Sequence, residues 1–261
     1  MSVGRLTPRV LELVGRAMGR FAMLRPGDRV AVGVSGGKDS LCLLGALAAW
    51  RRQAPFAYEL VAVTVEQGKF TADIGAIEET IAALDVPWVR RRDPATLRLV
   101  ADVVAHGCDV CSRHRRRELY RAADELDCSA LALGHTADDC AEALLRNILF
   151  NGRIASLPPV ARSRRGRVRV IRPLVFVPEA LTRAWARDRH LRIVGCACGG
   201  RDGVRRELRA FLAGLAERRP GVLESIVAAL GNVNPYTLLD PDLVRTGADP
   251  SPAFVADARR A

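Results

Sequence analysis

Residues 30–41 read VAVGVSGGKDSL, and this stretch decides the fold. Its first five residues form a short apolar run, as expected for a strand buried within a parallel sheet. The glycine-rich turn leads directly into residues 40–50, where leucine and alanine recur at helical spacing. A strand, a glycine-rich turn and a helix in this order indicate an α/β protein.

The same alternation continues along the chain. The order predicts a doubly wound parallel sheet that binds its ligands at the carboxyl ends of the strands. Only helical spacing follows between residues 204 and 231, which predicts a small helical C-terminal extension. Besides a first helix at 10–21, we expect strands at 60–65, 88–91, 130–134 and 168–171, and helices at 74–84, 112–126, 137–150 and after Pro178. We divide the chain into an N-terminal helix (1–24), an α/β domain (25–200), a helical extension (201–240) and a flexible tail (241–261).

The composition sets limits on function. Hydrophobic residues make up 49% of the 261 residues, which excludes a disordered chain, and no apolar run has the length of a membrane span. The first residues lack a secretory signal, so we expect a cytoplasmic protein with no membrane partner. The net charge of +11 favours a polyanionic partner such as nucleic acid. However, Lys38 and Lys69 are the only lysines, and such arginine dominance is also typical of GC-rich genomes.

The turn at residues 35–40 has the chemistry of a phosphate-binding loop. Two adjacent glycines let the backbone approach an anion, and the amides of the following helix N-terminus carry partial positive charge. The lysine adds a full positive charge, the serines add hydroxyl donors, and Asp39 is a candidate magnesium ligand. The loop is too short for a Walker A motif. The expected phosphate-binding residues are Ser35, Gly36, Gly37, Lys38, Asp39 and Ser40.

A second polar element, residues 134–139, follows another predicted strand and reads GHTADD. It should open on the same edge of the sheet. Gly134 and His135 are expected to contact the ligand of the phosphate-binding loop, and the aspartate pair to hold magnesium or orient that ligand. The pair is also compatible with ordinary acidic residues at a helix N-terminus. We predict Lys38, Asp39 and Asp139 as the catalytic residues.

Four of the seven cysteines form two close pairs, Cys108 with Cys111 and Cys196 with Cys198. Two thiolates separated by two residues can ligate one metal or cluster, and the basic run after Cys111 would favour the thiolate form. A redox role or a zinc site remains compatible with one such pair. The other three cysteines lie singly among apolar neighbours and are interpreted as packing residues: Cys42, Cys128 and Cys140.

Residues 35–40 match the signature of the PP-loop, or N-type ATP pyrophosphatase, superfamily at every fixed position. The chain further resembles the TtcA-type tRNA 2-thiocytidine synthetases of this superfamily from about Arg5 to Asp240. The stretches that carry this resemblance are 108–116 (CDVCSRHRR), 134–139, 151–159 (NGRIASLPP), 171–174 (IRPL), 198–199, 219–221 and 232–235.

The resemblance implies an enzyme that uses ATP and Mg2+. The C2 oxygen of a cytidine in a tRNA anticodon loop would be adenylated, and sulfur from a 4Fe-4S cluster would then give 2-thiocytidine. Cys108 and Cys111 map onto two of the cluster's three ligands. The third lies in a family motif Cys-x-x-Cys-Gly that is one residue shorter here, so we expect Cys198, with Cys196 as the alternative. The implied partners are tRNA and a sulfur donor such as a cysteine desulfurase, and a homodimer is compatible.

Arginines are candidates for tRNA phosphate contacts in two places, although both runs are also compatible with a solvated surface. They are Arg113 with residues 115–117, and the run 162–169. Three alternative functions stay open. A tRNA 2-thiouridine synthetase would carry zinc-binding cysteine pairs near its termini, but no cysteine precedes Cys42 or follows Cys198. A lysidine synthetase would not need paired cysteines, and a non-catalytic, zinc-stabilised RNA-binding protein would not need the phosphate loop.

Overall fold

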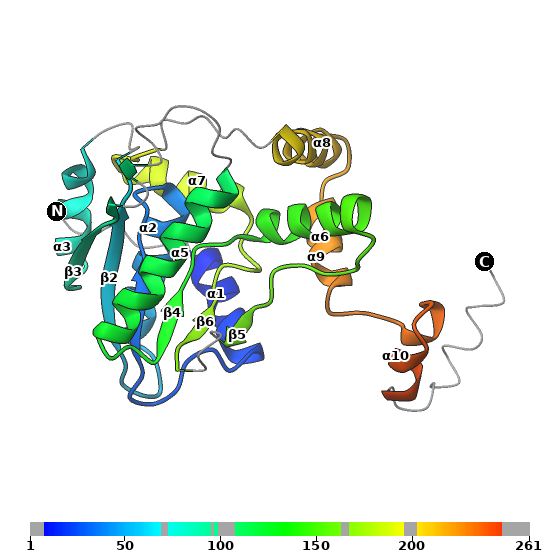
Figure 1. Ribbon diagram of the computed structural model, residues 1–261, viewed down its shortest axis with the longest axis horizontal. Coiled ribbons are helices and arrows are strands. Elements are labelled where there is room, and N and C mark those ends of the chain that lie inside the picture. Colours follow the sequence, from blue (N-terminus) through cyan, green and yellow to red (C-terminus); the bar gives the residue numbers. More distant parts are fainter. Residues whose placement is uncertain are drawn as a thin grey trace.

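The computed structural model describes residues 8–68, 73–94, 97–98, 108–162, 167–195 and 203–246. Figure 1 shows the arrangement of its helices and strands. In chain order they are α1 (Pro8–Arg20), β1 (Arg29–Gly33), α2 (Lys38–Arg51), β2 (Glu59–Glu66), η1 (Ile74–Ile77), α3 (Glu78–Ala82), β3 (Trp88–Arg92), α5 (Cys108–Glu125), β4 (Ala130–Ala132), α6 (Ala137–Asn151), β5 (Val160–Arg162), β6 (Arg169–Ile171), α7 (Glu179–Asp188), α8 (Gly203–Arg218), α9 (Val222–Ala229), η2 (Pro235–Thr237) and α10 (Pro241–Thr246).

Within the described residues, six strands form one sheet in the order β3-β2-β1-β4-β6-β5. All neighbouring pairs are parallel except β5 with β6. In the middle of the sheet, Val32 pairs with Ala62 on one side and with Ala132 on the other. The strand order reverses between β1 and β4, and such a reversal opens a crevice at the carboxyl ends of the two strands. The segments that follow β1 and β4 therefore meet there.

Helices cover both faces of the sheet, which confirms the predicted doubly wound architecture (Figure 1). The apolar side of α5 packs on one face, where Leu119 contacts the cluster that contains Ala31 and Val63. Helices α1, α2 and α7 pack on the other face, with Leu44 and Trp185 fully buried. Burying each large apolar side chain contributes roughly 1.5–3 kcal/mol, and β1 is stabilised from both sides. The site is thus built at the end of a strand that is buried on both faces.

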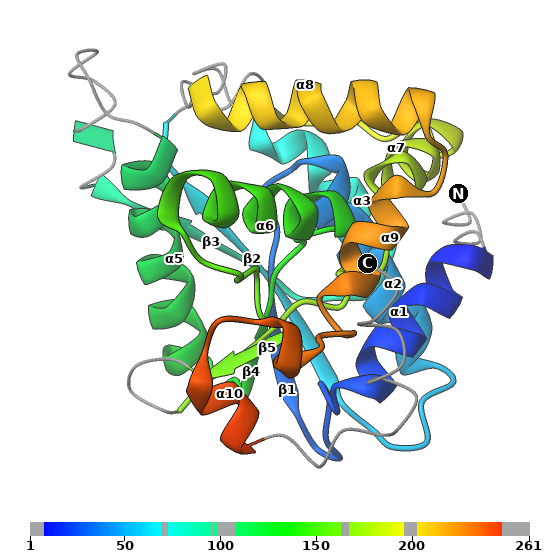
Figure 2. The same ribbon diagram turned by 90° about the vertical axis from the view of Figure 1, so that its right-hand side faces the viewer.

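The C-terminal helices do not cover the sheet. Helices α8 and α9 pack against α6, and Figure 2 shows α8 lying along α6. Leu208 and Leu212 are the residues of α8 that are buried, whereas α9 has no buried residue. The predicted helical extension is confirmed. It begins next to α6, the helix that follows the second polar element.

The structure differs from the sequence-based expectations at several boundaries. Strand β5 was not predicted, because three residues of an antiparallel edge strand give too short a pattern. Helix α5 begins at Cys108 instead of residue 112, so the first cysteine pair lies inside the helix. The predicted tail starts with α10 at Pro241–Thr246. Among the described helices, none combines the length and apolar character that a bilayer crossing requires.

Candidate active site

The turn between β1 and α2 has a conformation that only glycine fits at one position. Gly36 has a φ of +83°, and a Cβ there would lie 2.8 Å from the Cβ of Val194. The amide of Val194 donates to the carbonyl of Gly36 at 3.0 Å, which fixes this approach. Gly37 precedes the helix in an extended conformation and supplies no side-chain cap. The first amides of α2 are therefore available to an anion.

The two serines of the loop close it upon itself. The Ser40 hydroxyl donates to the carbonyl of Gly37 at 2.8 Å and accepts from the amide of Ser35 at 3.2 Å. The two hydroxyl oxygens lie 3.3 Å apart. In this arrangement Ser40 shapes the loop, while Gly36 and Gly37 present the backbone. The cradle has the form expected for a diphosphate.

Lys38 is held by two carboxylates. Its Nζ lies 2.9 Å from Asp39 Oδ2 and 2.8 Å from Glu179 Oε1. Burial would lower the pKa of Lys38, but the hydrogen bonds to Glu179 and Asp39 outweigh it, and the pKa is raised. The hydroxyl of Thr182 donates to the other oxygen of Asp39. The lysine is thus fully charged, and α7 sets its position.

The adjacent aspartates of the second polar element serve different helices. Asp138 Oδ2 accepts from the backbone amide of Glu179 at 2.7 Å and so caps α7, whose own N-cap residue, Pro178, makes no side-chain cap. Burial raises the pKa of Asp138. Asp139 instead caps its own helix α6, where its Oδ2 accepts from the amide of Thr136 at 2.9 Å. The pair does not present two free carboxylates to one metal ion.

The other oxygen of Asp139 belongs to a four-residue ion cluster between α6 and α8. Arg205 and Arg209 each place Nη2 3.1 Å from Asp139 Oδ1 and Nε 2.7 Å from an oxygen of Glu142. We call these four residues the arginine clamp. The carboxylate side chains are only 12% and 8% exposed. Burial would raise the pKa of Asp139, but the Thr136 hydrogen bond and the two arginines outweigh it and lower the pKa.

Gly134 and His135 connect this element to the loop. A Cβ at Gly134 would lie 3.2 Å from the carbonyl group of Asp39, so glycine allows the two segments to touch. His135 Nδ1 accepts from Arg172 Nε at 3.2 Å, which leaves the proton of the neutral ring on Nε2. Burial, together with the positive charges of Arg172 and Arg116, lowers the pKa of His135 to about 4. His135 is therefore a neutral hydrogen-bond donor at pH 7.

The first cysteine pair lies in the first turn of α5. Cys108 and Cys111 are three positions apart in this helix, the spacing that a pair of ligands on one helix face requires. Cys111 is buried, and Gln67, which follows β2, donates to its carbonyl at 3.1 Å. Thiolates are the ligands of iron–sulfur clusters, so the donor type and spacing fit the implied group. The Cys108 side chain, Cys196 and Cys198 lie outside the described residues.

Within the described ranges, no three potential metal ligands gather into one site. The three cysteines interpreted as packing residues are buried, which confirms that prediction. Burial raises the pKa of the Cys42 thiol to about 12 and those of Cys128 and Cys140 to about 11. These thiols are protonated at neutral pH and are poor metal ligands.

The arginine run at 162–169 is only partly available for RNA. Arg169 forms an ion pair with Asp28, and Arg167 lies 3.5 Å from Asp124. Residues 163–166 lie outside the described part of the chain. The prediction of a phosphate contact is therefore wrong for Arg169, because its largely buried guanidinium is paired with Asp28.

Several residues of the site were not found from the sequence. Arg172 stands in a quoted stretch but received no role there. Glu179 and Thr182 lie far along the chain from the loop that they contact, and nothing in their local pattern marks them. The two arginines of the clamp are four residues apart on a predicted helix, and this spacing was an available sign that they share one face.

Comparisons with known proteins agree with this geometry. A family model described as the PP-loop domain matches residues 11–196. The chain therefore belongs to the PP-loop family. Two curated relatives named tRNA-cytidine(32) 2-sulfurtransferase, from Anaeromyxobacter dehalogenans (strain 2CP-C) and Anaeromyxobacter sp. (strain Fw109-5), are each 40% identical over 95% of this chain, which covers 89% and 84% of theirs. The chain belongs to this sulfurtransferase family and is an enzyme.

One solved structure also supports the assignment. The chain is similar to the U34-tRNA thiolase NcsA from Methanococcus maripaludis, solved with its 4Fe-4S cluster, at 26% identity and a TM-score of 0.67. The match covers 86% of this chain and 77% of that one. Both the sequence and the structural comparisons thus lead to tRNA thiolation.

Proposed function

We propose that this enzyme adenylates the C2 oxygen of a cytidine in the anticodon loop of tRNA and replaces that oxygen with sulfur. The sulfur would come through a 4Fe-4S cluster held by Cys108, Cys111 and Cys198. The cytidine is favoured over uridine because the curated relatives carry the name tRNA-cytidine(32) 2-sulfurtransferase. Position 32 is accordingly the proposed target.

One observation carries the proposal: the cysteine-bearing turn of α5 is fixed at the same edge of the sheet as the phosphate loop. Gln67, directly after β2, binds the Cys111 carbonyl, and the loop follows the adjacent strand β1. Arg115 and Arg116 of α5 act electrostatically on His135, which follows β4. Activation of the base and delivery of sulfur can therefore occur in one crevice.

The loop residues have distinct roles in this proposal. Backbone amides at Gly37 and the start of α2 hold the β- and γ-phosphates, and Lys38 neutralises the diphosphate as it leaves. When ATP enters, Lys38 exchanges contacts with Asp39 and Glu179 for phosphate oxygens. Asp39 then becomes available to Mg2+, which prefers carboxylate oxygen and water as ligands. His135 donates from Nε2 to the nucleotide.

The reaction conserves atoms in two displacements. The cytidine O2 attacks the α-phosphate, and diphosphate departs. Sulfide then attacks C2 and expels AMP together with the former O2. A 4Fe-4S cluster held by Cys108, Cys111 and Cys198 would supply the sulfide for this second displacement. A donor such as a cysteine desulfurase would deliver sulfur at the persulfide level, and two electrons from a reductant would be needed to return that sulfur to sulfide.

For Asp139 we propose a positioning role. Its contacts among the described residues are the Thr136 cap and the two arginines of the clamp. It aligns α6, and so fixes Gly134 and His135 against the loop.

Nucleoside mass spectrometry of tRNA from a deletion strain tests the function. We expect loss of 2-thiocytidine and its return with the wild-type gene, but not with a Lys38→Ala gene. Loss of 2-thiouridine instead would establish the rival uridine thiolase, and an unchanged thionucleoside profile would refute thiolation. Metal analysis of anaerobically purified protein separates a third case. Full occupancy by zinc would indicate a zinc-stabilised RNA-binding protein.

A further inference from the structure

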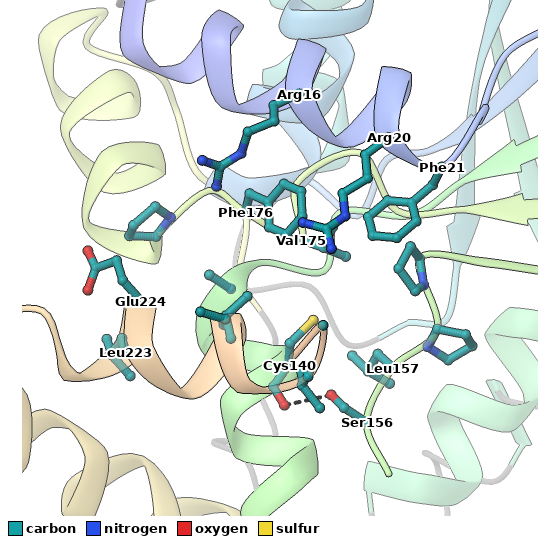
Figure 3. Close-up of a pocket in the computed structure, with 18 of the residues that line it drawn as sticks. Arg16, Arg20, Phe21, Cys140, Ser156, Leu157, Val175, Phe176, Leu223 and Glu224 are labelled. Carbon is teal, nitrogen blue, oxygen red and sulfur yellow. Dashed lines mark hydrogen bonds between the residues drawn. The ribbon is translucent and has the colours of Figure 1, made fainter. Parts of the chain in front are cut away.

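A second cavity lies beside the candidate active site and has no role in the chemistry above. It has a volume of about 450 Å³ and lies between α1, the first turn of α6, the segments around residues 157 and 176, and α9 (Figure 3). Ala137 and Cys140 of α6 line it, whereas Asp139 and Glu142 face α8 from the same helix. The cavity and the arginine clamp are thus on different sides of one helix.

Two positive charges enter this cavity without a partner. Arg16 and Arg20 are one turn apart on the exposed side of α1, and Figure 3 shows both guanidinium groups reaching over the cavity. Within the described part of the chain, neither forms an ion pair or a hydrogen bond. Each instead lies over an aromatic ring, at 4.6 Å from the centroid of Phe176 and 5.8 Å from that of Phe21. The remaining charged lining residue is Glu224, on the opposite rim.

The walls are mainly apolar and partly aromatic. The rings of Phe21 and Phe176 are 5.8 Å apart at an angle of 36°, and Leu157, Val175 and Leu223 complete the surface. An apolar ligand would leave both guanidinium groups unpaired, and a simple anion would leave the apolar walls exposed to water. A nucleotide satisfies both, because its base packs on the walls and its phosphate meets the arginines.

We propose that this cavity binds an unstacked nucleotide of the substrate RNA, next to the nucleotide that is modified. The inference rests on the proposed function, since a tRNA loop supplies unpaired bases. The cavity adjoins the candidate active site, because Pro178 of the cavity wall directly precedes Glu179, which binds Lys38. A base held here keeps the neighbouring part of the loop open over the crevice.

The first test measures how tightly an anticodon stem-loop RNA binds, by fluorescence anisotropy over a range of salt concentrations. We expect an Arg16→Gln/Arg20→Gln double variant to bind roughly ten-fold or more weakly than wild type. The slope of log K against log salt should be shallower by about 0.7, because the two arginines together neutralise one phosphate of the single strand. Arg52→Gln is the matched control, an exposed arginine beyond the C-terminal end of α2, and should bind as wild type. Equal affinity of the double variant and this control would overturn the proposal.

The second test addresses the base. Stem-loops with one abasic nucleotide at successive loop positions are titrated against the wild-type chain. At one loop position other than the thiolated one, we expect the abasic nucleotide to lower the affinity at least about five-fold, as for loss of one stacked base. In the double variant, the abasic nucleotide at that position should lower the affinity by a smaller factor. Sensitivity confined to the thiolated position, or to none, would overturn the proposal. Wild-type thiolation of tRNA, measured in parallel, decides the proposed function independently.

Discussion

Removing Arg205 and Arg209 singly and together should show that the arginine clamp works as a unit. Each guanidinium makes two short contacts, but their side chains are 42% and 49% exposed, so solvent screens them. One arginine still neutralises both carboxylates when the other becomes glutamine. Each single variant should therefore lose only about 1 kcal/mol of unfolding free energy.

The double variant leaves two nearly buried carboxylates without a cation. Such uncompensated charges cost about 3–5 kcal/mol, so we expect roughly 4 kcal/mol for the pair and a coupling of about 2 kcal/mol. Urea unfolding followed by circular dichroism measures the unfolding free energy of the wild type, the two single variants and the double variant. Arg206→Gln, on the exposed side of the same helix, is the control and should change stability by less than about 0.5 kcal/mol. Additive losses in the double variant would refute the shared clamp.

Three further predictions concern the loop, the sheet edge and the cysteines. Gly36→Ala should abolish tRNA-dependent ATP–pyrophosphate exchange and lower the melting temperature, whereas Gly19→Ala, with open space at its Cβ, should do neither; retained exchange would contradict the loop geometry. Burial acts to raise the pKa of Asp28, but hydrogen bonds from Ser129 and Arg169 outweigh it and lower the pKa, so its contribution to stability is present above pH 3.8 and is lost as pH falls through the folded-state value. The unfolding free energies of wild type and Asp28→Asn should accordingly differ at pH 7 and converge at lower pH, and a gap that does not narrow would contradict this assignment. Cys111→Ala should lose iron and visible absorption in anaerobic preparations while a Cys140→Ala control keeps both; equal iron in the two would exclude Cys111 as a ligand.

The strand, turn and helix at residues 30–50 could be predicted because their signals are local. An apolar run, two glycines and a helical repeat each occupy one short window. The meeting of this loop with residues 134–139 followed from a general rule on parallel sheets, without knowledge of any contact. The fold and the position of the crevice could therefore be predicted from the sequence alone.

The partners within the crevice were not accessible in this way. Glu179 reaches Lys38 across 141 positions of sequence, and only the packing of α7 on α2 brings them together. The adjacent Asp138 and Asp139 look equivalent in the sequence, yet one caps α7 and the other joins the clamp. Which way each carboxylate points depends on helices that the local pattern does not place.

Helix α1 has a consequence for synthesis of the chain on the ribosome. Its first partner is made soon afterwards, because α1 packs against α2 and the Trp50 indole donates to the carbonyl of Leu11 at 3.2 Å. Phe21, directly after α1, instead packs against Phe176, which is made much later. Until residue 176 has left the exit tunnel, Phe21 lacks this aromatic partner, so chaperones that bind emerging polypeptides should contact this end of α1.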